Sequence, residues 1–171
     1  MGMTPNEFLE SFVEGNYYDC VDAPGNVRRA FNAAVSAAHL ADHYYNYHKR
    51  HSPSKLDQFR GLGDFVGYVS KDTGGAFKDI RSISNAYKHL YTSTDPKRES
   101  YISIASTGAI ESVSLLNDED DIDEIEEDFV ASQHEGGFHS RVVFTRRDGQ
   151  RIEFLPVLKV VVDYWYEFVY R

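Results

Sequence analysis

The segment from residue 76 to residue 91 carries the side chains best suited to chemistry. Its sequence, AFKDIRSISNAYKHLY, places Arg81, Asn85 and His89 at positions i, i+4 and i+8. At about 100° per residue these three side chains lie along one side of a helix, so we expect them to reach a common groove. A guanidinium, an amide and an imidazole together suit phosphate contact and proton transfer near neutral pH.

The opposite side of this helix is predicted to face the core. Its apolar residues fall within an arc of about 80°, and they are Ala76, Ile80, Ile83, Tyr87 and Leu90. Lys78 and Lys88 lie on the polar side and are predicted as additional phosphate contacts. A solvated face or an internal polar network is the alternative interpretation, because every surface helix places polar residues opposite its core stripe.

The same helix resembles the HEPN superfamily of all-α domains. The string Asn85-Ala86-Tyr87-Lys88-His89 is similar to the N-x-x-K-H segment of uncharacterised HEPN-like proteins. In active members of the family an Arg, four to six residues and a His form a motif at a dimer interface, where it cleaves RNA without a metal ion. The resemblance implies that Arg81 and His89 are the motif pair, with Asn85 beside them. Seven residues separate the pair here, one more than the family motif has.

A metal site is an alternative use of the histidines. His39 and His43 stand at i and i+4 with Asp42 beside them, a spacing that can place two imidazoles on one metal ion. A third ligand has to come from another helix, and His89 is the candidate. On a helical wheel the first two histidines lie about 130–170° from the centre of the apolar seam, which favours ordinary surface histidines.

Charge is concentrated in one segment. Residues 118–128 hold nine acids and no base, and the rest of the chain has 18 acids against 18 Lys plus Arg, so this segment accounts for the net charge of −9. The neutral remainder does not support a general attraction to nucleic acid. The run lacks the glycine of a calcium-binding loop, and the spacing of Ile122, Ile125 and Phe129 predicts a short surface helix. Ion binding, or mimicry of a nucleic-acid backbone, is the alternative.

The first half of the chain is predicted to be helical, over residues 5–19, 26–50, 54–70 and 76–91. In the first helix, a capping box formed by Thr4 and Glu7 marks the start, and Phe8, Phe12 and Tyr18 are expected to face inward. The second helix has a seam suited to close helix packing, made of Val27, Phe31, Ala34, Ala38, Ala41 and Tyr45. The third is expected to bury Leu56, Phe59, Leu62 or Gly63, Val66 and Val69.

The second half alternates between strand and turn signals. Strands are predicted over residues 101–106, 109–116, 138–146 and 151–155, and Asp148-Gly149 is a strong hairpin signal between the last two. A final helix over residues 156–171 is apolar except for one stripe of paired charges, Lys159, Asp163, Glu167 and Arg171. Such a helix is expected to lie buried between the bundle and the sheet.

These observations predict one α+β domain spanning residues 1–171. A HEPN-like helical bundle of four to five helices (residues 4–92 and 156–171) carries a small antiparallel sheet of about four strands, inserted over residues 100–155 before the C-terminal helix. A single cysteine, Cys20, the absence of a signal peptide and the lack of a membrane-spanning apolar stretch favour a cytoplasmic protein. Without a dinucleotide fingerprint or a P-loop, no cofactor is predicted.

Three functions are consistent with this pattern. The first is a non-catalytic interaction or nucleic-acid-associated module with an RNA or protein partner, forming a homodimer through the polar side of helix 76–91 or through the small-residue seam. The second is a metal-independent endoribonuclease in which His89 acts as acid or base and Arg81 steadies the scissile phosphate. The third is a metal-binding bundle that uses His39, His43 and His89.

Overall fold

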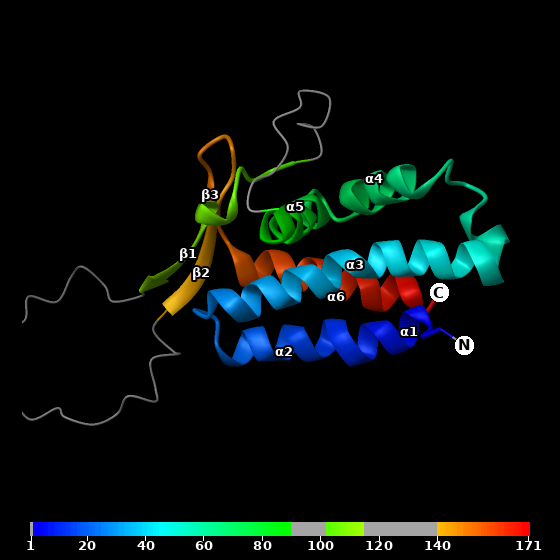
Figure 1. Ribbon diagram of the computed structural model, residues 1–171, viewed down its shortest axis with the longest axis horizontal. Helices are drawn as coiled ribbons and strands as arrows, with labels where there is room; N and C mark the ends of the chain where they lie inside the picture. The colour runs from blue at the N-terminus through cyan, green and yellow to red at the C-terminus, as the bar shows by residue number, and fades with distance from the viewer. Residues whose placement is uncertain (1, 90–101, 115–139) are drawn as a thin grey trace, which may run out of the picture.

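A computed structural model describes residues 2–89, 102–114 and 140–171. Long helices lie side by side and form the body of the molecule, and a small antiparallel sheet lies at one end (Figure 1). The sheet precedes the C-terminal helix in the chain, which confirms the predicted α+β class. The predicted acidic helix at residues 118–128 lies outside the described part of the chain.

The first helix is a continuous rod made of α1 (Pro5–Phe8), a π-helical stretch (Leu9–Glu14) and α2 (Gly15–Asp22). The predicted capping box is confirmed: the Glu7 backbone N–H donates to Thr4 Oγ1 at 3.2 Å, and the Thr4 backbone N–H donates to the Glu7 carboxylate at 2.7 Å. These two bonds satisfy backbone donors that would otherwise lack partners at the start of the helix.

The π-helical stretch changes which residues of the first helix face the core. Leu9, Val13 and Cys20 are buried, whereas Phe12 is 45% exposed and Tyr18 is 56% exposed. The prediction that Phe12 and Tyr18 face inward is therefore wrong. A π-helix bonds i to i+5, so it shifts the phase of a wheel drawn at 100° per residue.

Helix α3 (Val27–His51) is the central element of the bundle and begins at Asn26, whose Oδ1 accepts from the Arg29 backbone N–H at 3.1 Å. The first helix, α5 and α6 all pack on it. Six alanines on its length are buried, and they are Ala30, Ala33, Ala34, Ala37, Ala38 and Ala41. The predicted close packing at the seam is confirmed, but it occurs inside one chain. The seam is covered, so the expectation that it forms a homodimer interface is wrong.

The third predicted helix is interrupted. A 3₁₀ turn (Pro53–Leu56) and helix α4 (Leu62–Asp72) replace the helix expected over residues 54–70. Gly61 has an extended backbone at the start of α4, and the Asp64 carboxylate accepts from the Arg60 backbone N–H at 3.1 Å. Helix α4 starts directly after Gly61, whose carbonyl accepts from the Asp64 and Phe65 N–H groups at 3.1 Å. Leu56, Phe65 and Val69 are buried, and Phe59 is half-buried.

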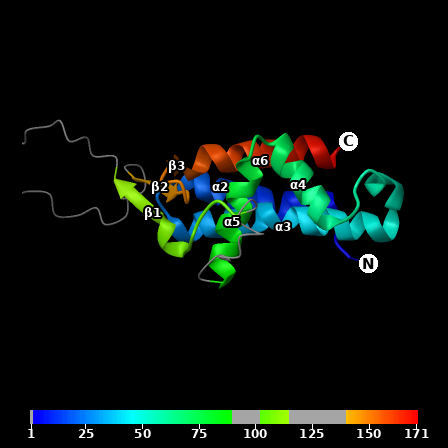
Figure 2. The ribbon, with the colours of Figure 1, turned by 90° about the horizontal axis from the view of Figure 1, so that it is seen from above.

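Helix α5 (Ala76–His89) follows a tight connection in which Gly74 and Gly75 have φ of 60° and 93°. In Figure 2 it crosses α3 at a steep angle, whereas α6 runs alongside α3. Its core residues include Phe77, Ile80, Ile83 and Ala86. Tyr87 is 54% exposed, so its predicted inward position is wrong: it lies in the last turn of α5, with its ring against Phe31 at a centroid distance of 5.0 Å. Leu90 lies beyond the described part of this helix.

The sheet has the antiparallel order β1 (Ile110–Ser114), β2 (Ser140–Thr145), β3 (Arg151–Glu153), with Phe144 paired to Ile110 and Ile152. The described residues therefore form three strands where about four were predicted. The Asp148-Gly149 hairpin is confirmed: Gly149 has a φ of 87°, and the Arg146 N–H donates to the Gln150 carbonyl at 2.9 Å.

The strand predicted at residues 101–106 is wrong over residues 102–105, which form no strand, and residue 101 lies outside the described residues. The backbone of Ser103 bonds to α5 and to the hairpin instead. The Ser103 N–H donates to Ser82 Oγ at 2.9 Å, and the Ser103 carbonyl accepts from the Arg147 N–H at 2.8 Å. Ser82 Oγ donates in turn to the Lys78 carbonyl at 2.7 Å.

Helix α6 (Phe154–Val169) begins two residues before the predicted start and lies against the first helix, α3 and α5. Trp165 is buried, and its indole N–H donates to the Ala37 carbonyl of α3 at 3.0 Å. The two predicted ion pairs of its polar stripe are present, Lys159–Asp163 at 2.6 Å and Glu167–Arg171 at 3.2 Å. None of the helices in the described ranges combines the length and the apolar character that a membrane crossing requires.

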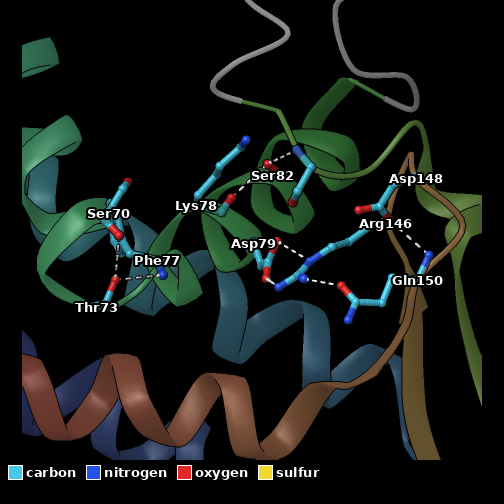
Figure 3. Close-up of polar contacts among 10 residues, drawn as sticks. Ser70, Thr73, Phe77, Lys78, Asp79, Ser82, Arg146, Asp148 and Gln150 are labelled. Atoms are coloured by element: carbon cyan, nitrogen blue, oxygen red, sulfur yellow. Dashed lines mark hydrogen bonds and ion pairs between the residues drawn. The ribbon is translucent and has the colours of Figure 1, made fainter.

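An ion pair connects the hairpin to α5. The carboxylate of Asp79, which is only 2% exposed, binds Nε and Nη2 of Arg146, and Nη1 of Arg146 donates to Gln150 at 2.5 Å (Figure 3). A second contact joins the sheet to the loop between α2 and α3, where the Val142 N–H of β2 donates to the Pro24 carbonyl at 2.8 Å. Gly25 is required there, because a Cβ on it would lie 1.8 Å from Ser140 Oγ.

The burial of the Asp79–Arg146 pair predicts an asymmetric response to mutation. Arg146→Ala leaves a buried carboxylate without its cation, which we expect to cost about 3 kcal/mol of unfolding free energy. Asp79→Ala costs less, because the Arg146 side chain is 30% exposed and can turn into solvent. Arg141→Ala, which breaks the exposed pair with Glu153, is the control and costs about 0–1 kcal/mol. Urea unfolding measures all three. Equal losses for Arg146→Ala and Arg141→Ala would contradict the assignment.

Candidate functional site

The polar side of α5 faces α3, and an ion pair joins the two helices. Nη1 of Arg81 lies 3.1 Å from Oδ2 of Asp42, and Nη2 lies 3.3 Å from Oδ1. This is a bidentate pair, in which the planar fork of the guanidinium matches the carboxylate. Both side chains are partly exposed, Arg81 at 26% and Asp42 at 34%. The charge that was predicted for phosphate contact is therefore directed at a carboxylate of the same chain.

A second contact lies beside this pair, where Lys88 Nζ meets His39 Nε2. An ammonium has donors only, so Nε2 accepts and the imidazole is neutral in this arrangement. Burial lowers the pKa of His39, and the positive charge of Lys88 lowers it further. Burial is also the largest cause of the lowered pKa of Lys88, and Arg81 adds to it. We call His39, Asp42, Arg81, Asn85 and Lys88 the α5 face.

The α5 face carries more positive than negative charge. Arg81 and Lys88 are both cations, and Asp42 is the only acid within the face. Asp42 raises the pKa of both His39 and Lys88, but in each case this effect is outweighed, because both pKa values are lowered overall. A negatively charged group brought to Lys88 would relieve this excess.

The structure brings some of the predicted site residues together and separates others. Asn85 lies one turn from Arg81 and is half-buried, and its side-chain amide makes no hydrogen bond with any residue of the described ranges. Lys88 takes the place expected of His89, which is exposed and lies about 100° further round the helix. Lys78 is half-buried, and Figure 3 shows its side chain pointing away from Asp79 and Arg146.

The three histidines of the metal alternative do not assemble. His43 Nε2 lies 2.8 Å from the Met3 carbonyl, and its ring stacks on Phe8 at 4.8 Å, so it faces the first helix. His39 faces Lys88 instead. Over the ranges that the structure describes, no three His, Cys, Asp or Glu side chains lie close enough together to hold a metal ion.

A groove of about 280 Å³ opens between the first helix, α3 and the last turn of α5. Its aromatic lining comes from Phe8, Phe12 and Tyr87, and its other lining residues are Asn16, Asn32, Val35, Ser36 and His39. His39 belongs both to the groove and to the α5 face, so the two features are continuous. Within the described part of the chain, the side-chain amides of Asn16 and Asn32 make no hydrogen bond.

Sequence reasoning missed this groove and the partner of Arg81. The groove depends on the exposure of Phe12 and Tyr87, which a regular helical wheel places inside. Asp42 lies 39 residues before Arg81 in the chain, and nothing local marks it as the partner. Its position beside His39 and His43 was visible, but it suggested a metal ligand.

Comparisons with protein-family models, with curated proteins and with solved structures found no match to this chain. The resemblance to the HEPN superfamily therefore depends on the α5 residues alone.

The pKa of His39 tests the geometry of the α5 face. We expect it below the ordinary value of about 6.5, as followed by NMR titration of the imidazole signals. Lys88→Gln raises the pKa of His39 but leaves it below 6.5, because burial is the larger cause. Asp42→Asn lowers it further. Lys55→Gln, beside His48, is the control and leaves it unchanged. A pKa of His39 at its ordinary value, unchanged in Lys88→Gln, would contradict the contact between His39 and Lys88.

Proposed function

We propose that this chain is a HEPN-like, non-catalytic interaction module that binds a partner through the α5 face and the adjoining groove. The observation that carries the proposal is the bidentate pair between Arg81 and Asp42. An arginine that is to steady a scissile phosphate must direct its charge at that phosphate. Here both terminal nitrogens bind a carboxylate, which offsets the charge and uses two of the five N–H donors.

The position of His89 also favours a non-catalytic role. A general acid or base has to reach the same phosphate that the arginine holds. His89 lies about 80° round the helix from Arg81 and is exposed, while the residue beside Arg81 in the α5 face is Lys88. Lysine keeps its charge near neutral pH, so it suits binding better than proton transfer.

A protein partner fits this surface better than RNA does. Outside residues 118–128 the chain carries no net charge, so it offers no general electrostatic attraction to a polyanion. The groove offers aromatic rings, and side-chain amides that no described residue binds, which suit protein side chains and backbone. A second copy of the chain is one partner of this kind, as the homodimer hypothesis expects.

Site-specific photo-crosslinking in cells that express the chain tests the proposal. A photo-reactive amino acid at position 87, on the rim of the groove, is expected to form a discrete adduct with a partner. The matched control is position 68 on α4, where Tyr68 is also exposed and lines a different surface depression. Equal adducts from both positions, or none from position 87, would contradict the proposal.

An RNA cleavage assay provides the second arm of this experiment. Pure protein incubated with mixed RNA and a chelator is expected to leave the RNA intact, and His89→Ala is expected to behave as the wild type does. Cleavage that resists the chelator and disappears in His89→Ala would overturn the non-catalytic assignment in favour of the endoribonuclease.

A further inference from the structure

The groove presents exposed aromatic rings on both sides of α3. Phe12 comes from the first helix and is 45% exposed, and Tyr87 comes from α5 and is 54% exposed. Phe8 lies behind Phe12 with ring centroids 5.2 Å apart, and Phe31 supports Tyr87. Exposed rings that are held by neighbouring rings are typical of surfaces that receive an aromatic anchor from a partner.

The lining of the groove offers hydrogen-bonding groups that no described residue uses. The amides of Asn16 and Asn32 have no partner among the described residues, whereas Ser36 Oγ is satisfied by the Ala33 carbonyl at 3.1 Å. A side-chain amide presents a donor and an acceptor together. This is the pairing that the peptide unit of an extended chain requires.

Cationic side chains lie beside the groove. His39 lines the groove and contacts Lys88, and Arg81 lies beside them. Among the described residues, Arg81 pairs directly with Asp42, whereas Lys88 contacts the neutral imidazole of His39. A carboxylate from a partner would restore the charge balance at Lys88.

From these three features we propose that the groove binds an extended protein segment carrying an aromatic residue followed by an acidic one. The ring packs between Phe12 and Tyr87, the segment's backbone bonds to the amides of Asn16 and Asn32, and the carboxylate pairs with Lys88. This inference rests on the proposed function and names the chemistry of its partner.

The dimensions of the groove favour such a segment over a bulkier occupant. A volume of about 280 Å³ lies near the lower end of the roughly 300–1,000 Å³ of small-molecule sites. It suits one ring with its adjoining backbone and is too small to hold a whole helix.

Fluorescence anisotropy with a labelled peptide, Gly-Ser-Trp-Asp-Glu-Gly, tests the inference on the full chain. We expect saturable binding that weakens about tenfold or more in Tyr87→Ala and Lys88→Gln, the loss typical of an anchor contact. Asn32→Ala, at an exposed position, should weaken it less. The NMR signals of His39 should report a raised pKa in the bound state, because a carboxylate then lies near the imidazole.

Matched controls separate this site from general stickiness. Tyr68→Ala is expected to bind as the wild type does, since Tyr68 lies on α4 away from the groove. Peptides in which Ala replaces the Trp, or Asn and Gln replace the two acids, should each bind about tenfold more weakly. No binding of the parent peptide, or binding that survives Tyr87→Ala, would overturn the inference. A single-stranded RNA that binds more tightly and depends on the same residues would also overturn it.

Failure of the peptide inference can be told apart from failure of the proposed function by combining the peptide assay with the crosslinking experiment. If crosslinking from position 87 captures a partner but the peptide does not bind, the acidic-aromatic chemistry is wrong and the interaction module stands. If position 87 gives no specific adduct and the peptide does not bind, both fail.

Discussion

The structure depends on one packing constraint: other helices must pack against α3 around most of its circumference. Six buried alanines allow the first helix, α5 and α6 to approach it closely, and Ala37 is small enough for the indole of Trp165 to reach its carbonyl. The side of α3 that remains polar is a stripe through Asn32, His39 and Asp42. This stripe forms the floor of the groove and one half of the α5 face, so the candidate site arises from the only side of α3 that the bundle leaves incompletely covered in the described ranges.

Asp42 decides what this stripe can do. If α3 carried no acid opposite Arg81, the guanidinium would be free to bind an anion. With Asp42 opposite, the guanidinium joins α5 to α3, and the excess positive charge of the α5 face lies on Lys88, beside the neutral imidazole of His39. Arg81, one of the α5 residues that resemble a nuclease motif, thereby has a structural role, and the binding role belongs to our proposal for Lys88. The same polar side chains support different chemistry because their partners differ.

Local signals predicted the elements well, and long-range contacts account for what they missed. The limits of the second helix were predicted within one residue at each end, and the hairpin at Asp148-Gly149 was predicted correctly, because caps and turn residues act on their immediate neighbours. The inward prediction for Phe12 failed because a π-helical stretch changed the phase of the helix. The prediction of a strand at residues 101–106 was wrong because the backbone of Ser103 bonds to Ser82 and Arg147. The pairing of Arg81 with Asp42 spans 39 residues, and no periodicity within a single helix encodes such a partner.

The most direct test of the central claim is a double-mutant cycle between Arg81 and Asp42. Unfolding free energies of Arg81→Gln, Asp42→Asn and the double variant give the coupling between the two side chains, independently of any partner or substrate. A bidentate, partly buried pair predicts a favourable coupling of about 1 kcal/mol that decreases in high salt. A coupling indistinguishable from zero would show that Arg81 is not held by Asp42, and would return it to the role of a free cation available to a phosphate.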